Sequence, residues 1–300
     1  MRLVDRLKEE RGQRIDHSLY YWTQILMAYN SNHMEGSTLT AEQTRQIYET
    51  NSFLPESGEQ IHVDDVIETR NHFQAFSYLL DHVDEPITDN LVWKLHALLK
   101  QGTSQENNPH YSVGAYKTRE NEIGQILGIT SLPTVAAAKV PHMMRLVFDE
   151  YQQLTDNPVH IALCHWMFER VHPFSDGNGR IGRLLMFKEC LRLNTVPPLV
   201  RDEHHNLYIK GLTEFPTQPG WLVDLLLSER DFYEYTFIQQ MGQGQIQYKY
   251  VEQWSEQDSS PWLEKAENFT RLLAQAVPSP TQGEDSLFHY RSSAPRKHIR

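Results

Sequence analysis

Cysteine, long apolar runs and excess positive charge are all scarce in this 300-residue sequence. Two cysteines, Cys164 and Cys190, are too few for a disulfide scaffold and favour a reducing compartment, the cytoplasm. No apolar run approaches the roughly 18 residues of a membrane span, and the charged N-terminus lacks the apolar segment of a secretory signal. We therefore expect no membrane partner.

Charge and composition narrow the class of protein further. The net charge of −11, from 28 Lys and Arg against 39 Asp and Glu, disfavours a nucleic-acid-binding surface but allows one small anion pocket. The hydrophobic content of 39% is ordinary for a globular chain and excludes a mostly disordered one.

Helical periodicity dominates the sequence that is present. Thr40 and Gln43 form a capping box, and two segments are apolar nearly all round, which is typical of helices in the middle of a bundle. Apolar spacings of three and four predict helices over residues 14–34, 41–50, 63–82, 88–100, 141–155, 158–171, 180–193, 205–214, 220–240 and 249–276.

The stretch between residues 101 and 140 differs, because it is turn-rich and then carries β-branched residues between glycines. We expect a short hairpin or flap near 123–132. The predicted fold class is all-α, a helical bundle with a small β-hairpin flap. Its expected organisation is an N-terminal helical region over 1–60, a core over 61–200, C-terminal helices over 201–276 and a disordered tail over 277–300.

The most informative segment is HPFSDGNGRIGR, residues 172–183, which lies between the two most apolar helices. Its glycines, Gly177 and Gly179, permit close backbone approach, and successive N–H groups at a helix N-terminus bind anions. Arg180 and Arg183 are three residues apart and share a helix face, where they supply two guanidinium groups for phosphate.

Two further residues of this segment add chemistry to the anion site. Asp176 supplies one carboxylate, which can hold Mg²⁺ together with phosphate oxygens. His172 supplies an imidazole that takes a proton near neutral pH. Together these residue types predict a nucleoside triphosphate site beside a general base.

This segment resembles the Fic family signature H-x-F-x-[D/E]-G-N-G-R-x-x-R at every fixed position. The resemblance extends over about residues 20–240 through RNHFQAF (70–76), LHALL (95–99) and VGAYK (113–117), and it implies the Fic fold. Lys117 departs from the pattern, because many members have arginine there.

The resemblance implies a Mg²⁺-dependent protein adenylyltransferase, which transfers AMP from ATP to a Ser, Thr or Tyr hydroxyl of a target protein. His172 resembles the general base, Phe174 the buried anchor of the loop and Asp176 the Mg²⁺ ligand. The residues that resemble the phosphate-binding set are Gly177, Asn178, Gly179, Arg180 and Arg183. Tyr208 lies where the family often has an aromatic residue beside adenine, and a packed helix tyrosine is the alternative.

A second motif, SNHMEG at residues 31–36, resembles the Fic inhibitory motif [S/T]-x-x-x-E-[G/N] in its N-terminal, class II position, with Ser31 first and Glu35 fifth. Glu35 ends a predicted helix, where the helix dipole disfavours an anion, so a cationic partner is expected. In the family that partner is the second arginine of the signature, here Arg183. The resemblance therefore implies autoinhibition of ATP use by Glu35.

Several alternatives stay open at this point. The resemblance also allows removal of AMP with Glu35 positioning water, transfer of phosphate or phosphocholine, or a non-catalytic interaction module. The flap near 123–132 resembles the hairpin that holds a protein substrate by strand addition. With 14 tyrosines the chain is itself a candidate target, and a homodimer is compatible with the resemblance.

Overall fold

The computed structural model describes residues 1–55, 58, 60–123, 132–242, 244–251 and 253–278. Helices dominate it, as predicted. The first half contains α1 (Leu3–Gln13), α2 (Leu19–His33), α3 (Ala41–Thr50), α4 (Val63–Asp81), α5 (Asp89–Lys100), β1 (Glu122–Ile123) and β2 (Leu132–Pro133). The second half contains η1 (Ala137–Lys139), α6 (Val140–Gln152), α7 (Pro158–Val171), α8 (Asn178–Leu193), η2 (Asp202–His204), α9 (His205–Glu214), α10 (Gly220–Tyr233), η3 (Glu234–Ile238), α11 (Gln239–Gly242) and α12 (Glu256–Ala276).

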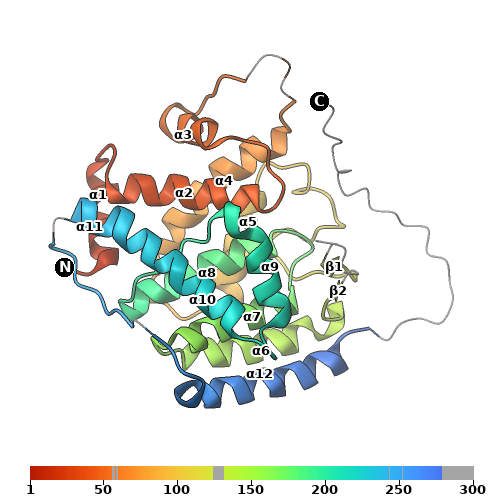
Figure 1. Ribbon diagram of the computed structural model, residues 1–300. Helices are drawn as coiled ribbons and strands as arrows, with labels where there is room; N and C mark the ends of the chain where they lie inside the picture. Colours follow the sequence, from red (N-terminus) through yellow and green to blue (C-terminus); the bar gives the residue numbers. More distant parts are fainter. Residues whose placement is uncertain (56–57, 59, 124–131, 243, 252, 279–300) are drawn as a thin grey trace, which may run out of the picture.

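Helices α7 and α8 form the centre of the bundle (Figure 1). Helix α7 packs against α6, α10 and α12, and α8 packs against α7, α2, α4 and α5. Almost every side chain of both helices is buried, which explains why their sequences are apolar nearly all round. The short connection between them therefore lies where α2, α4 and α5 approach the start of α8.

Local signals set several helix boundaries as expected. The hydroxyl of Thr40 accepts from the Gln43 N–H at 3.1 Å, and the Gln43 side chain accepts from the Thr40 N–H at 2.9 Å, so the predicted capping box is present. Helix α3 spans Ala41–Thr50, the predicted range. This helix projects at the top of Figure 1, away from the bundle centre.

Helix α1 is present in the structure, but the sequence patterns do not predict it. Its segment stands out as a charged N-terminus, yet Leu3, Val4 and Leu7 follow helical spacing and are at most 1% exposed. Abundant charges on the outer face of the helix conceal this short apolar stripe. Helix α1 packs against α2, α4 and α8, so it completes the core on that side.

Two predicted helices begin later than expected. The helix expected over 14–34 begins at Leu19, because the Ser18 hydroxyl caps it at the Tyr21 N–H, and Ile15 is 41% exposed outside it. The helix expected over 249–276 begins at Glu256. The Lys249 N–H instead bonds the Asn194 carbonyl at 2.7 Å, which holds the preceding segment extended.

The expected flap is described only at its base. Strands β1 and β2 pair antiparallel, with Ile123 opposite Leu132, while residues 124–131 lie outside the described part of the chain. Of the expected tail over 277–300, residues 279–300 also lie outside it. Among the described residues, no helix has the length and apolarity needed to cross a membrane.

Candidate active site

The segment 172–183 forms the connection between α7 and α8. His172 ends α7 at a φ of 52°, and Gly177 begins α8 at a φ of 82°, a conformation that glycine adopts without strain. Phe174 is fully buried and stacks on His96, with ring centroids 4.1 Å apart. The loop is therefore anchored at both helix ends and at its middle.

Asn178 holds the loop through its side chain. Its Oδ1 accepts from the Phe174 N–H at 2.8 Å, and its Nδ2 donates to the Phe174 carbonyl at 2.9 Å. The residue is 1% exposed. Because the side chain is engaged within the loop, the group that Asn178 can offer a phosphate is its backbone N–H.

The start of α8 presents unpaired N–H groups. The Ile181 N–H bonds the Gly177 carbonyl at 3.1 Å, whereas the N–H groups of residues 178–180 meet no acceptor in the described chain. A helix N-terminus carries partial positive charge in addition to these free donors. This end of α8 is therefore suited to bind an anion.

A carboxylate of the chain itself lies at this helix end. The Arg183 Nη2 donates to Glu35 Oε1 at 2.8 Å, and Arg183 also donates to the hydroxyl of Ser31 at 2.9 Å and to its carbonyl at 3.0 Å. A Cβ placed on Gly179 would overlap the Glu35 carboxylate, so this carboxylate lies directly against the first turn of α8. The sequence thus brings Ser31, Glu35 and Arg183 together across 148 residues and more.

The charges around Glu35 keep it ionised. Burial by itself would raise the pKa of the Glu35 carboxyl, but Arg183 and Arg180 lower it below its usual value. The side chain is 29% exposed, since it follows the end of α2. Glu35 is therefore an ionised carboxylate beside the start of α8 that remains in contact with solvent.

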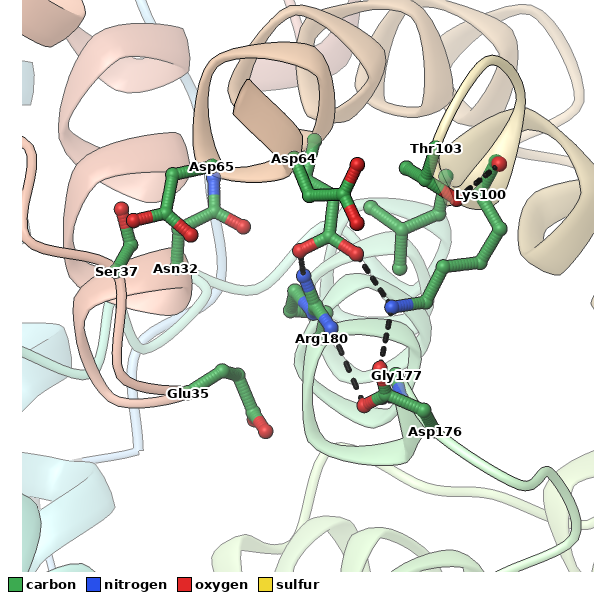
Figure 2. A network of polar contacts seen from close by, with 12 residues as sticks. Asn32, Glu35, Ser37, Asp64, Asp65, Lys100, Thr103, Asp176, Gly177 and Arg180 are labelled. Atoms are coloured by element: carbon green, nitrogen blue, oxygen red, sulfur yellow. Dashed lines mark hydrogen bonds and ion pairs between the residues drawn. The ribbon is translucent and has the colours of Figure 1, made fainter. Parts of the chain in front are cut away.

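The other arginine, Arg180, belongs to a closed ring of ionic contacts (Figure 2). Glu68 from α4 pairs with both Arg180 and Lys100. Asp176 accepts from Lys100 Nζ at 2.5 Å and lies 3.4 Å from Arg180 Nη2. Two cations thus alternate with two carboxylates at the start of α8.

Asp176 fits a magnesium ion only in company with phosphate oxygens. Burial by itself would raise the pKa of its carboxyl, but Lys100 and Arg180 lower it far below the usual range. Its oxygens already accept from Lys100, from Gln105 Nε2 at 2.7 Å and from the Gly177 N–H at 2.6 Å. The described residues contain no group of three or more His, Cys, Asp and Glu side chains placed to hold a metal alone. One carboxylate with substrate phosphates is a common arrangement for Mg²⁺.

The imidazole of His172, at the start of the loop, is held neutral. Burial first, and then the charge of Lys117, lower the pKa of the His172 imidazole to about 4. Lys117 Nζ donates to Asn121 and Thr134, both at 2.6 Å, and Asn121 donates to the Phe174 carbonyl at 3.0 Å. The lysine that departs from the family pattern therefore ties the base of the flap to the loop.

Tyr208 is placed inside the bundle. It is 2% exposed, its hydroxyl lies 2.6 Å from His165 Nε2, and the Arg183 guanidinium carbon lies 5.8 Å from its ring centre. This arrangement is that of a packed helix tyrosine, which contacts the site through Arg183. A place beside adenine stays a prediction for Tyr208.

Sequence reasoning missed Glu68, Lys100 and Gln105. Glu68 shares a helix face with the buried His72, and Lys100 ends an otherwise apolar segment, LHALLK. Charged residues at positions facing the core were the available signal. That signal does not tell which charged residues pair with one another, because the ionic ring joins residues from α4, α5 and α8.

Several known proteins resemble this chain. Residues 86–190, about a third of the chain, match the model of the Fic/DOC family. The protein adenylyltransferase fic-1 of Caenorhabditis elegans is 27% identical over 192 residues, which cover 63% of this chain and 36% of that protein. The protein adenylyltransferase Fic of Nematostella vectensis is 27% identical, over 62% and 42% of the two chains. This chain thus matches less than half the length of those relatives.

Solved structures share the fold. A Fic domain containing signalling protein from Bacteroides thetaiotaomicron superposes with a TM-score of 0.59 at 22% identity, covering 79% of this chain and 94% of that one. A solved portion of Fic-1 from C. elegans gives a TM-score of 0.56 at 21% identity, over 79% of this chain and 68% of that one. These likenesses establish the helical Fic fold.

Proposed function

We propose that the protein transfers AMP from ATP to a Ser, Thr or Tyr hydroxyl of a protein target, and that Glu35 holds this activity down. The observation that carries the proposal is an internal anion at the start of α8: the Glu35 carboxylate lies against Gly179 and pairs with Arg183 at 2.8 Å. A phosphate has the same charge and seeks the same donors. The adenylyltransferase activity is that of the named relatives.

The proposed reaction uses the loop residues as follows. The target hydroxyl oxygen bonds the α-phosphorus, the bond from that phosphorus to the pyrophosphate oxygen breaks, and His172 accepts the hydroxyl proton. With its pKa lowered to about 4, His172 is neutral at pH 7 and able to accept that proton. The free N–H groups of 178–180, Arg180 and Arg183 stabilise the phosphate charge.

Asp176 is the residue we propose for holding Mg²⁺ that accompanies ATP. When bound, that ion would neutralise phosphate charge. Asp176 is ionised and its side chain is 34% exposed, so it is accessible from the site. We also propose the cytoplasm as the compartment, since Cys164 and Cys190 are buried free thiols.

The target segment is proposed to dock at the flap near 123–132 by strand addition. Support comes from the base of the flap, where Lys117 and Asn121 connect it to the loop at Phe174. A segment bound there would be fixed relative to His172. Because the chain carries 14 tyrosines, self-modification is the simplest form of this transfer to test.

Removal of AMP is the second candidate. Its specific support is Glu35 itself, an ionised carboxylate that is 29% exposed and therefore able to orient a water molecule. In that case Glu35→Gly would lose release of AMP from a modified protein. In the case of transfer, the same variant gains activity.

The test is intact mass after incubation with ATP and Mg²⁺, for wild type, Glu35→Gly and Glu35→Gly/His172→Ala. Release of an inhibitory contact is expected to raise AMP addition roughly 10–100-fold. Loss of a general base lowers it by about 100-fold or more. Glu267→Gln, which removes an exposed carboxylate of α12, is the matched control and should behave as wild type.

Each outcome separates one part of the proposal. Equal addition by wild type and Glu35→Gly would remove autoinhibition, and equal addition with and without His172 would remove the base. If no variant adds AMP to itself, labelled ATP in a cell lysate tests other targets. Absence of labelling there, together with loss of AMP release in Glu35→Gly, would replace transfer by removal.

A further inference from the structure

Lys100, the last residue of α5, is a third cation at the candidate phosphate site and lies outside the 172–183 segment. Its side chain is fully buried, and its ammonium pairs with Glu68 and with Asp176. Figure 2 shows the contact with Asp176. A Cβ on Gly177 would come within 3.4 Å of Lys100 Cε, so the stem packs directly beneath the loop. The position of this ammonium is therefore fixed by packing as well as by charge.

Stability alone does not account for a lysine at this position. Buried ion pairs are often replaced by apolar residues without loss of stability, because the desolvation of both charges opposes their attraction. A fully buried lysine is also rare unless it is paired. The chemistry at the start of α8 offers a reason of a different kind.

That reason is the charge balance of the site. Asp176, Glu68 and Glu35 contribute three negative charges, and the two arginines compensate only two of them. Lys100 makes the cluster neutral. Without it, an incoming polyphosphate would meet a net negative site while Glu35 is in place.

The contacts of Asp176 lead to the same conclusion. An ionised carboxylate offers about four lone-pair sites. Lys100 and Gln105 share Oδ2, and the Gly177 N–H and Arg180 share Oδ1. A divalent cation at Asp176 would share these oxygens with the four donors, so Lys100 and Mg²⁺ would neutralise the same carboxylate.

We propose that Lys100 is a phosphate-site cation that neutralises part of the charge of Asp176, as a divalent ion would. Nucleotide binding would then depend less on Mg²⁺ than it would with Asp176 and no Lys100. This assignment rests on the proposed nucleotide site. It adds to the two arginines of the signature a third cation, contributed by a separate helix. It also gives Glu68 a role, because Glu68 restrains both Lys100 and Arg180.

The experiment is equilibrium binding of ATP in Mg²⁺ and in EDTA, from which the ratio of the two dissociation constants is taken. Loss of one hydrogen bond to a charged group corresponds to roughly 10–100-fold in an equilibrium constant. In Lys100→Met the ratio of the EDTA to the Mg²⁺ dissociation constant should exceed that of wild type by at least about tenfold. A purely structural role for Lys100 would weaken both conditions equally and leave this ratio unchanged.

Lys188→Met is the matched control. Lys188 is also fully buried, but it donates to Glu189 and to the carbonyls of Val83 and Glu85, far along α8 from the loop. Its ratio should equal that of wild type. An equal rise in both lysine variants would overturn the assignment.

Glu68→Gln provides a second, opposite arm, which decides the matter if Lys100→Met does not fold. It loosens the hold on Lys100 and Arg180, so ATP in EDTA should bind several-fold more tightly. Asp64→Asn removes the same charge one turn earlier on α4, where Asp64 bonds Ser104 at 3.0 Å instead, and should change nothing. No gain in Glu68→Gln overturns the role of Lys100, whereas no ATP binding by wild type in either buffer overturns the nucleotide site itself.

Discussion

The two signature arginines lie one turn apart on α8 but are held by different parts of the molecule. Arg183 is held by Ser31 and Glu35, both in the segment that ends α2. Arg180 is held by Glu68, in the second turn of α4, and by Asp176 in its own loop. One arginine is thus tied to a terminal segment and the other to the core.

The two arginines differ in how easily their carboxylate contacts can be broken. Glu35 follows the last turn of α2 and its side chain is 29% exposed, so movement of one short segment separates Glu35 from Arg183. Glu68 is 14% exposed and also bonds the buried Lys100, so Arg180 is freed only if the core rearranges. The first contact is suited to regulation, and the second to keeping the site assembled.

The largest effect we expect is on stability and falls on the core side. Arg180→Ala leaves Glu68 and Asp176 to share Lys100 alone, and breaking a buried pair in this way costs about 3–5 kcal/mol. Arg183→Ala exposes Glu35 to water and should cost about 1–2 kcal/mol, mainly its bonds to Ser31. Urea unfolding of both variants, with the exposed Arg271→Ala as control, measures the gap. Equal losses would show that the two contacts do not differ.

A smaller effect concerns His72, a fully buried residue of α4 whose pKa both arginines influence. Burial first, then Arg180 and then Arg183, lower the pKa of its imidazole to about 3, so it stays neutral in the folded state. Its stabilising contribution is complete above the unfolded pKa of about 6.5 and is lost as pH falls toward about 3.

His72→Gln should therefore remove about 2 kcal/mol of the drop in stability between pH 7 and pH 5, on the basis of about 1.4 kcal/mol per pH unit. Unfolding free energies at the two pH values give the slope. His142→Gln, at an exposed position of α6, is the control and should keep the wild-type slope. An unchanged slope in His72→Gln would mean that the imidazole is not kept neutral by its surroundings.

The smallest effect compares two glycines of α8. A Cβ on Gly179 meets the Glu35 and Arg183 side-chain ends, which can move, and alanine favours the helix by up to about 1 kcal/mol, so Gly179→Ala should be nearly neutral. A Cβ on Gly182 overlaps the buried Glu169 carboxylate and lies 3.1 Å from a Phe168 ring atom, so Gly182→Ala should cost about 1–2 kcal/mol. Thermal unfolding distinguishes them, and identical shifts would argue against a movable Glu35.

Much of this arrangement was predictable because its determinants are local. The capping box of Thr40 and Gln43 and the all-round apolar sequences of α7 and α8 depend on neighbouring residues only. The motif residues were predictable because they follow one another in a single loop. Helix α1 was missed since its charges outnumber the stripe of Leu3, Val4 and Leu7.

The ionic ring was not predictable for a physical reason. Glu68, Lys100 and Arg180 lie on three helices, and hydrophobic periodicity tells which face of each is buried but not which faces meet. The Glu35–Arg183 contact was predictable only through the family resemblance. The packing of Tyr208 beneath Arg183 likewise depends on the position of α9, which its own sequence does not determine.

The two hydrogen bonds between the Asn178 side chain and the Phe174 backbone affect how the protein ages chemically. Asn178 and Gly179 form the dipeptide in which an asparagine most readily cyclises and deamidates, because glycine leaves the following nitrogen unhindered. That cyclisation requires the amide carbon to swing onto the next backbone nitrogen, and here both ends of the amide are bonded to Phe174. An aspartate in its place would set an oxygen against the Phe174 carbonyl and open the loop. The fold therefore preserves this loop against the slow reaction that its own sequence invites.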